Sequence, residues 1–171
     1  MTQPPSPSGI VDRTDFIKAM RSVANSVTVV TTNGEAGCHG GTVSAFCSVS
    51  ADPPTVLVCL MDSSRIAQTT LQNGNFCVNV LPYSSQHVAD RFAGRHDDEV
   101  EDRFDGIVHQ PGLEAMPLIE NSTAFACQLH ETMLTGSHRI FVGRVLEVKE
   151  GIPEPLIYFN GQYGRVGGAG A

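Results

Sequence analysis

Residues 41–54 read GTVSAFCSVSADPP, a stretch of small and hydroxylated residues that ends in a double proline. Thr42 and Ser44 are two residues apart, and so are Ser48 and Ser50. Because side chains alternate along an extended chain, each pair is expected on one side of a strand. Such a surface offers backbone amides and hydroxyls with no bulky side chain between them. It suits a flat, polar-edged heterocycle with a phosphorylated tail, and it is also typical of an ordinary Ser/Thr-rich strand and turn.

Strand-forming segments flank this stretch on both sides. Before it, residues 27–32 form a β-branched run, and Asn33-Gly34 then predicts a hairpin turn with positive φ values. The chain is expected to return through residues 39–43. After the stretch, residues 55–61 form a continuous apolar run. This run predicts a central strand that is covered on both faces, or a strand that lines a barrel.

Three short helices are predicted, each preceded by a residue that can cap its N-terminus. The candidate caps are Asp12 or Thr14, then Ser63 or Ser64, and finally Ser84. The first helix spans residues 14–23 and places its apolar side chains on one stripe, made of Phe16, Ile17, Met20 and Val23. Asn73-Gly74 and Gly94 are expected to end the other two helices.

Later segments complete the predicted fold. Strands are expected at residues 76–81, 123–133, 138–148 and 156–159, whereas residues 95–105 are expected to form a solvated loop or short polar helix. Six or seven strands with tight turns and no regular βαβ alternation predict a mainly β fold with peripheral helices, a mostly antiparallel closed barrel. The predicted organisation is one domain over residues 12–166, with flexible tails at 1–11 and 167–171.

Composition excludes several classes of function. The net charge of -7 argues against nucleic-acid binding, and no apolar run approaches the ~20 residues of a membrane span. Five cysteines without C-x-x-C spacing predict buried, reduced thiols and a cytoplasmic location. The six histidines form no pair at metal-binding spacing, so no metal site is expected. Rossmann, Walker and G-x-S-x-G motifs are absent from the sequence.

An ordered set of motifs identifies a family resemblance. These motifs are residues 41–54 (GTVSAFCSVSADPP), 56–60 (VLVCL), Ser63-Ser64, 76–81 (FCVNVL), 91–94 (RFAG), Gly136-Ser137-His138 and 156–159 (LIYF). Together they resemble the flavin-reductase-like family of FMN-binding split barrels, and especially the small reductase components of two-component flavin-dependent monooxygenases. The resemblance covers residues 13–166.

The resemblance implies a set of site residues. The flavin ring would lie along Thr42, Val43, Ser44 and Ala45, and its ribityl-phosphate tail near Ser48, Val49, Ser50, Ser63 and Ser64. Phe92, Ala93 and Gly94 would approach the cofactor, and Tyr163 would close over it. His138 would be the catalytic residue beside the nicotinamide or the ring edge, with Ser137 in place of the family's usual acid. Arg91 is either a surface charge or a contact to a phosphate or dinucleotide.

The function implied is hydride transfer from NADH or NADPH to FMN or FAD by a homodimer that supplies reduced flavin to a separate monooxygenase. Such chemistry needs orientation of two rings more than it needs acid–base residues. Two alternatives stay open. One is a non-catalytic flavin- or haem-binding module. The other is a pyridoxamine-phosphate oxidase-like flavoenzyme, which would need a basic cluster, whereas the 11 Lys and Arg of this chain are spread along it.

Overall fold

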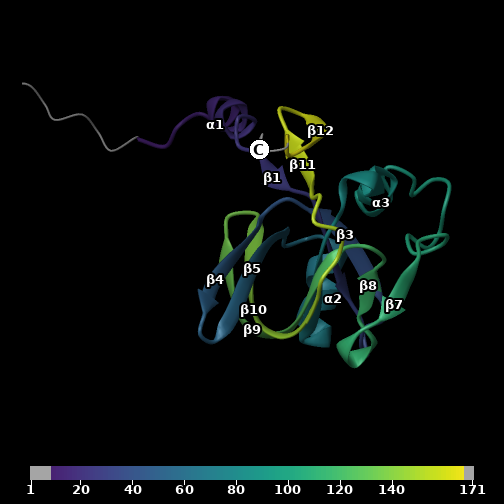
Figure 1. The fold of residues 1–171 in the computed structure, drawn as a ribbon. Coiled ribbons are helices and arrows are strands. Elements are labelled where there is room, and N and C mark those ends of the chain that lie inside the picture. Colours follow the sequence, from purple (N-terminus) through teal and green to yellow (C-terminus); the bar gives the residue numbers. More distant parts are fainter. Residues whose placement is uncertain (1–8, 168–171) are drawn as a thin grey trace, which may run out of the picture.

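The computed structural model describes residues 9–167 and is built around one antiparallel sheet of seven strands (Figure 1). The strands run in the order β3-β2-β6-β9-β10-β5-β4. Their bounds are β2 Thr28–Thr32, β3 His39–Val43, β4 Phe46–Ala51, β5 Pro54–Met61, β6 Asn75–Val80, β9 Thr123–Thr135 and β10 His138–Lys149. The predicted mainly antiparallel β fold is therefore confirmed.

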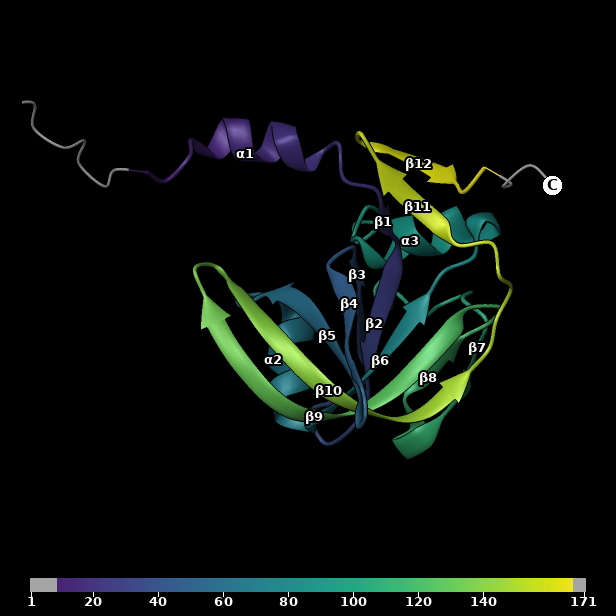
Figure 2. The ribbon, with the colours of Figure 1, turned by 60° about the vertical axis from the view of Figure 1, so that its left-hand side comes forward.

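The two outer strands of this sheet, β3 and β4, are consecutive in the chain and are joined only by Ser44 and Ala45. The long β9–β10 hairpin bends so that the sheet curls round on itself (Figure 2). The Cys59 N–H donates to the Ala45 carbonyl at 3.0 Å, which holds this link against β5. The barrel thus has a seam, and the residues of the seam belong to the motif-bearing stretch.

Shorter elements cover the rest of the barrel. A small sheet joins β1 (Asn25–Ser26), β11 (Leu156–Phe159) and β12 (Gln162–Arg165), and a hairpin pairs β7 (His109–Pro111) with β8 (Pro117–Ile119). The helices are α1 (Arg13–Met20), α2 (Arg65–Asn73) and α3 (Gln86–Phe92), with 3-10 turns at Tyr83–Ser85 and Leu113–Ala115. No helix within residues 9–167 is long and apolar enough to cross a membrane.

Two apolar clusters lie on opposite faces of the sheet. One fills the barrel around Val58, Phe76 and Phe141, and the other, with Phe92 and Leu156, lies beneath α3 and β11. β6 crosses the middle and buries five consecutive residues because both of its faces are covered. Each fully buried side chain of this size contributes roughly 1.5–3 kcal/mol, so these clusters dominate the stability of the fold.

The barrel's bend depends on one close approach. A Cβ on Gly143 of β10 would lie 2.4 Å from the ring of Phe76, and the β9–β10 register shifts between Val142 and Gly143. The absent side chain lets the buried ring sit under the strand, and the bulge bends the hairpin there.

Helix α2 follows its sequence signals closely. The Ser64 hydroxyl accepts from the Ala67 N–H at 3.3 Å, and Gly74 ends the helix with a left-handed φ of 69°. Ile66 and Ala67 are buried against the barrel. The capping prediction for Ser64 is confirmed, and it fixes where α2 begins relative to the seam.

Several local predictions are wrong. The β2–β3 connection has its positive φ at Gly37 and not at Asn33-Gly34, because the loop is longer than a two-residue turn. α3 begins after a 3-10 turn, so Ser84 does not cap it. Of the two alternatives for β5, cover on both faces is wrong, because the strand lies next to the edge strand β4. The other alternative, a strand that lines the barrel, is confirmed by the buried Val56, Val58 and Leu60.

The first helix buries none of its residues against the part of the chain that the structure describes. α1 runs over Arg13–Met20, shorter than predicted, and the Asp12 carboxylate caps it by accepting from the Thr14 N–H at 2.7 Å. Its predicted apolar stripe exists but is exposed: Phe16 is 55% and Met20 44% accessible. Figure 2 shows the helix projecting away from the barrel.

Candidate functional site

A pocket of about 440 Å³ opens at the seam of the barrel. It gathers the end of β3, the end of β5, the start of α2, the end of α3 and the start of β10. Its lining residues are Gly41, Thr42, Val43, Ser44, Ala45, Cys59, Leu60, Met61, Ser64, Ile66, Phe92, Ala93, Arg103 and His138. Eight of these fourteen residues are in the set that the sequence predicted.

The seam link supplies polar backbone to this pocket. Within residues 9–167, the N–H groups of Ser44 and Ala45 have no acceptor in the protein, because the ladder with β2 ends at Val43. Both residues are exposed and have small side chains. Two backbone donors therefore remain free on the pocket wall.

Thr42 joins the pocket wall to α3. Its hydroxyl donates to the Ala89 carbonyl at 2.6 Å, so its proton is already used inside the fold. The neighbouring Gly40 has no side chain, and a Cβ there would lie 2.6 Å from the ring of Phe92. This close approach brings the C-terminal end of α3, with Phe92 and Ala93, against β3.

His138 opens β10 and is held by the turn that precedes it. The Ser137 hydroxyl lies 3.0 Å from His138 Nδ1, and the Ser137 carbonyl accepts from the Asp62 N–H at 3.0 Å. The next residue, Arg139, donates from Nε to Asp62 Oδ1 at 2.6 Å. The hairpin tip is thereby fixed to the β5–α2 turn, and His138 lies beside Met61 across the β10–β5 ladder.

Tyr163 lies in a smaller hollow of about 180 Å³ that shares Thr42, Val43, Ser44 and Ala93 with the pocket. Its hydroxyl donates to Asp90 Oδ1 at 2.9 Å. Burial and this carboxylate raise the pKa of Tyr163 to about 12. Tyr163 is therefore a neutral phenol held at the rim of the seam.

The structure does not bring the remaining predicted residues into this pocket. Ser48, Val49 and Ser50 are on the exposed edge strand β4, beyond the pocket wall. Ser63 is in the β5–α2 turn, and Gly94 follows α3 with a φ of 79°. Arg91 donates to the Asp105 carbonyl at 3.1 Å, which ties α3 to the following loop.

Arg103 is the main residue that the sequence interpretation missed. Its guanidinium binds both oxygens of Asp97, at 2.8 and 2.6 Å, and donates to the carbonyls of Gly40 and Phe92 at 3.3 and 3.1 Å. Residues 95–105 form a loop, which is one of the two alternatives predicted for this segment. Arg103 anchors this loop to the site. In the sequence Arg103 is one charge in a polar run, and nothing there distinguishes it.

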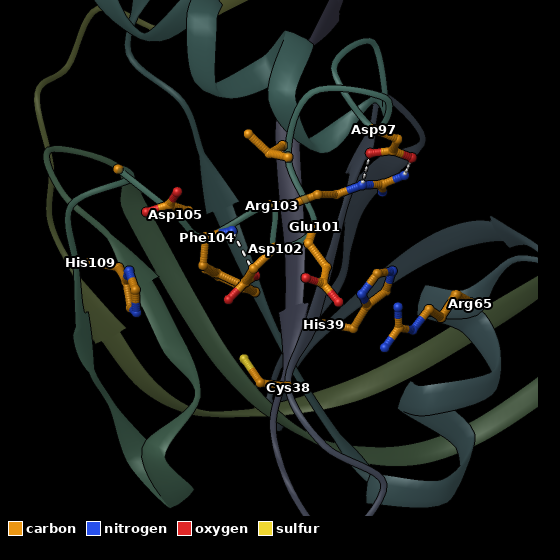
Figure 3. Close-up of a pocket in the computed structure, with 12 residues that line it drawn as sticks. Cys38, His39, Arg65, Asp97, Glu101, Asp102, Arg103, Phe104, Asp105 and His109 are labelled. Carbon is orange, nitrogen blue, oxygen red and sulfur yellow. Dashed lines mark hydrogen bonds and ion pairs between the residues drawn. The ribbon is translucent and has the colours of Figure 1, made fainter.

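Beyond Arg103 the site continues into a larger cavity of about 1200 Å³ (Figure 3). It lies between the start of β3, the start of α2 and the loop at 95–109. His39 faces this cavity, and burial together with the charges of Arg65 and Arg103 lowers its pKa to about 4. Cys38 lies there too, and burial raises the pKa of its thiol.

The cysteines divide into two kinds. All five are free; Cys77 and Cys127 are buried and Cys59 partly so, whereas Cys38 and Cys47 are exposed. Burial raises the pKa of the Cys127 thiol to about 12, so it is inert. The prediction that the cysteines are buried is therefore wrong for two of the five.

A flavin ring fits the pocket chemically. Leu60, Ile66 and Phe92 provide apolar surface, and the free N–H groups of Ser44 and Ala45 can meet the polar ring edge. The small residues at 42–45 leave the wall open to a flat molecule.

Comparisons with known proteins agree with this geometry. The flavin reductase like domain family matches residues 20–167. The FMN reductase (NADH) RutF of Ancylobacter novellus is 38% identical over 92% of this chain and 87% of its own.

Two solved structures share the fold. A nitrilotriacetate monooxygenase component B homolog from Mycobacterium thermoresistibile superposes with a TM-score of 0.83, at 30% identity over 91% of this chain and 87% of that one. The Streptomyces globisporus NADH:FAD oxidoreductase SgcE6, in complex with NAD and FAD fragments, gives 0.84 at 28% identity, over 96% of this chain and 100% of that one. With a seam pocket suited to a flavin and a family match over nearly its whole length, the chain belongs to the flavin reductase-like family.

Proposed function

We propose that this protein is an NADH-dependent flavin reductase whose seam pocket holds the flavin ring along Thr42, Val43, Ser44 and Ala45. When bound, the flavin supplies the redox chemistry by accepting a hydride from the nicotinamide. The observation that supports this proposal most is the pair of free backbone donors at Ser44 and Ala45, on the wall of a pocket that also has apolar surface from Leu60, Ile66 and Phe92. They can stabilise the negative charge that the ring gains on reduction.

The other pocket residues orient the two reactants. Ser64, Phe92 and Ala93 bound the pocket on the side of the helices, and His138 bounds it on the side of β10. His138 acts beside the nicotinamide and is oriented by the Ser137 hydroxyl at 3.0 Å. Tyr163 lies in the adjoining hollow and limits the entry of solvent.

The phosphorylated tail is assigned to β4 and the β5–α2 turn. Ser48 is three residues beyond Ala45, roughly 10 Å along an extended strand, a span that suits a ribityl chain. Ser48, Val49 and Ser50 are exposed, and Ser63 lies beside the cap of α2. Helix N-terminal amides favour a phosphate beside Ser63, whereas Ser48 and Ser50 pair with Val56 and Thr55 near the other end of β5 and would contact a different part of the tail.

The protein acts as a homodimer in this proposal. The support is apolar surface without cover: the α1 stripe, the edge strand β4, and residues such as Val49, Leu146 and Val148, which are 53–57% accessible. A second copy could cover these surfaces and enclose the exposed tail site on β4. Light scattering after size exclusion should give twice the 18.3 kDa of one chain, and a mass of one chain would reject the dimer.

Reduced flavin then leaves the pocket for a separate monooxygenase. We place this reaction in the cytoplasm, whose reducing conditions suit five free cysteines. The Mycobacterium relative carries the name of such a monooxygenase component. Retention of reduced flavin through many turnovers would contradict this part.

The central test is NADH oxidation at 340 nm by the purified protein, with and without added FMN or FAD. Flavin-dependent oxidation is expected. His138→Ala should lower kcat/KM for NADH about tenfold while flavin binding is unchanged, and Arg13→Ala on α1 is the control. Flavin binding without oxidation of either nicotinamide nucleotide would favour a non-catalytic module instead.

A further inference from the structure

The large cavity beside the flavin pocket has a charge pattern of its own. The charged side chains lining it are Arg65, Arg103, Asp97, Glu101, Asp102 and Asp105. Asp97 already binds both nitrogens of the Arg103 fork. Three carboxylates therefore face one remaining guanidinium, that of Arg65, which enters no ion pair within residues 9–167.

These groups are arranged in order away from the flavin pocket. Arg65 is the first residue of α2 and directly follows Ser64, which lines the flavin pocket. Figure 3 shows Arg65 and His39 side by side at one end, Glu101 and Asp102 in the middle, and His109 at the far end. Phe104 lies between, with its ring centroid 5.1 Å from that of His109.

Arg65, the carboxylates and the Phe104–His109 pair, which follow one another along the cavity, each suit a different chemical group. The free guanidinium of Arg65 suits a pyrophosphate, to which its planar fork can donate two hydrogen bonds. Carboxylates accept hydrogen bonds from the hydroxyls of a ribose, and an aromatic pair offers a surface on which a purine can stack. His39 is neutral above pH 4, so it adds no charge and can donate or accept a hydrogen bond.

Resting on the proposed function, we propose that this cavity takes the adenosine diphosphate moiety of NADH and that its carboxylates reject the extra 2′-phosphate of NADPH. A phosphate monoester carries nearly two negative charges near neutral pH. Placed among Glu101, Asp102 and Asp105, it would meet like charges with one cation available to offset them. The chain would thus select NADH by repulsion as well as by attraction.

The adenosine diphosphate moiety also occurs in FAD, so the experiment must separate the two sources. With FMN as the acceptor, only NADH carries this moiety. Arg65→Ala should then raise KM for NADH about tenfold with little change in kcat, and Arg13→Ala should not. A raised KM for FAD with an unchanged KM for NADH would place the flavin dinucleotide there and overturn the assignment to NADH.

Selectivity is tested by charge reversal. The ratio of kcat/KM for NADPH to that for NADH should rise at least tenfold in Glu101→Arg, and further in Glu101→Arg combined with Asp105→Arg. The matched control is Glu35→Arg, on an exposed loop outside the cavity. Equal use of both nucleotides by the unmodified protein, or a constant ratio in the double variant, would reject the repulsion.

A binding measurement keeps this inference separate from the proposed function. Calorimetric titration of flavin-free protein with ADP requires no turnover, and Arg65→Ala should weaken the binding about tenfold. If the protein oxidised no nicotinamide nucleotide, the proposed function would fail, while ADP binding would still test the cavity. Absence of ADP binding by the unmodified protein would overturn the site itself.

Discussion

The two halves of the stretch at 42–50 have similar compositions but different surroundings. Thr42 and Val43 in the first half are buried or half-buried between β2, α3 and the seam, and the Thr42 hydroxyl is bonded to Ala89 at 2.6 Å. Ser48 and Ser50 in the second half are exposed on an edge strand. The Thr42 hydroxyl therefore holds the fold together and the Ser50 hydroxyl bonds the backbone of Asp52, whereas the Ser48 hydroxyl has no partner within residues 9–167 and is available to a ligand.

The largest expected effect comes from filling the pocket at the point where the halves meet. Ala45→Phe places a ring in a space of about 440 Å³ and should lower kcat/KM for FMN roughly 100-fold. The matched change Ala51→Phe, at the far exposed end of β4, should leave it nearly unchanged. Both variants need a native circular dichroism spectrum. Normal turnover by Ala45→Phe would show that the flavin does not bind in this pocket.

The first half of the stretch is tested by its contribution to the stability of the fold. Thr42→Val removes one of the two donors to the Ala89 carbonyl, which then keeps only the Ala93 N–H, so the free energy of unfolding should fall by about 0.5–1.5 kcal/mol. Ser50→Ala removes a bond to Asp52 in an exposed turn and should change it by less than about 0.5 kcal/mol. Urea unfolding measures both. Equal effects of the two variants would remove the distinction between the halves.

The second half of the stretch is tested by its contribution to flavin binding. Ser48→Ala should weaken FMN about tenfold if its hydroxyl meets the phosphate, while riboflavin, which lacks the phosphate, should bind as before. Fluorescence quenching of each flavin gives the two dissociation constants. A parallel loss for FMN and riboflavin would assign Ser48 to the ring or to the fold.

A smaller effect is expected from the other end of β3, where His39 has its pKa lowered to about 4. The unfolded chain binds a proton near pH 6.5, so the folded state loses stability as the pH falls from about 6.5 to 4. His39→Gln should flatten this part of the stability curve. Arg65→Ala should raise the imidazole pKa, followed by NMR, because one of the charges opposing protonation is removed. An unchanged pKa would leave burial and the charge of Arg103 as the causes.

Much of the fold could be predicted because its signals are local. The Ser64 cap and Gly74 mark α2, β-branched runs mark β2 and β5, and Gly136-Ser137 joins the two long strands. Other local signals led to wrong predictions. The apolar stripe of α1 has helical spacing, but residues 9–167 leave it exposed. Cys38 and Cys47 are small residues among strands, and only the sheet order leaves them exposed.

The candidate site also has a part that the local sequence could predict and a part that it could not. The sequence by itself determined that residues 41–54 are small and hydroxylated, which suits a flavin as well as an ordinary strand and turn, and the family resemblance then predicted the flavin site there. It could not determine that β3 and β4 are opposite edges of one curled sheet, which leaves the Ser44 and Ala45 amides unpaired at a seam. Nor could it select Arg103, whose partners Gly40 and Phe92 are 63 and 11 residues away along the chain. Such long-range pairings are set by how the whole sheet closes, and only the tertiary structure decided them.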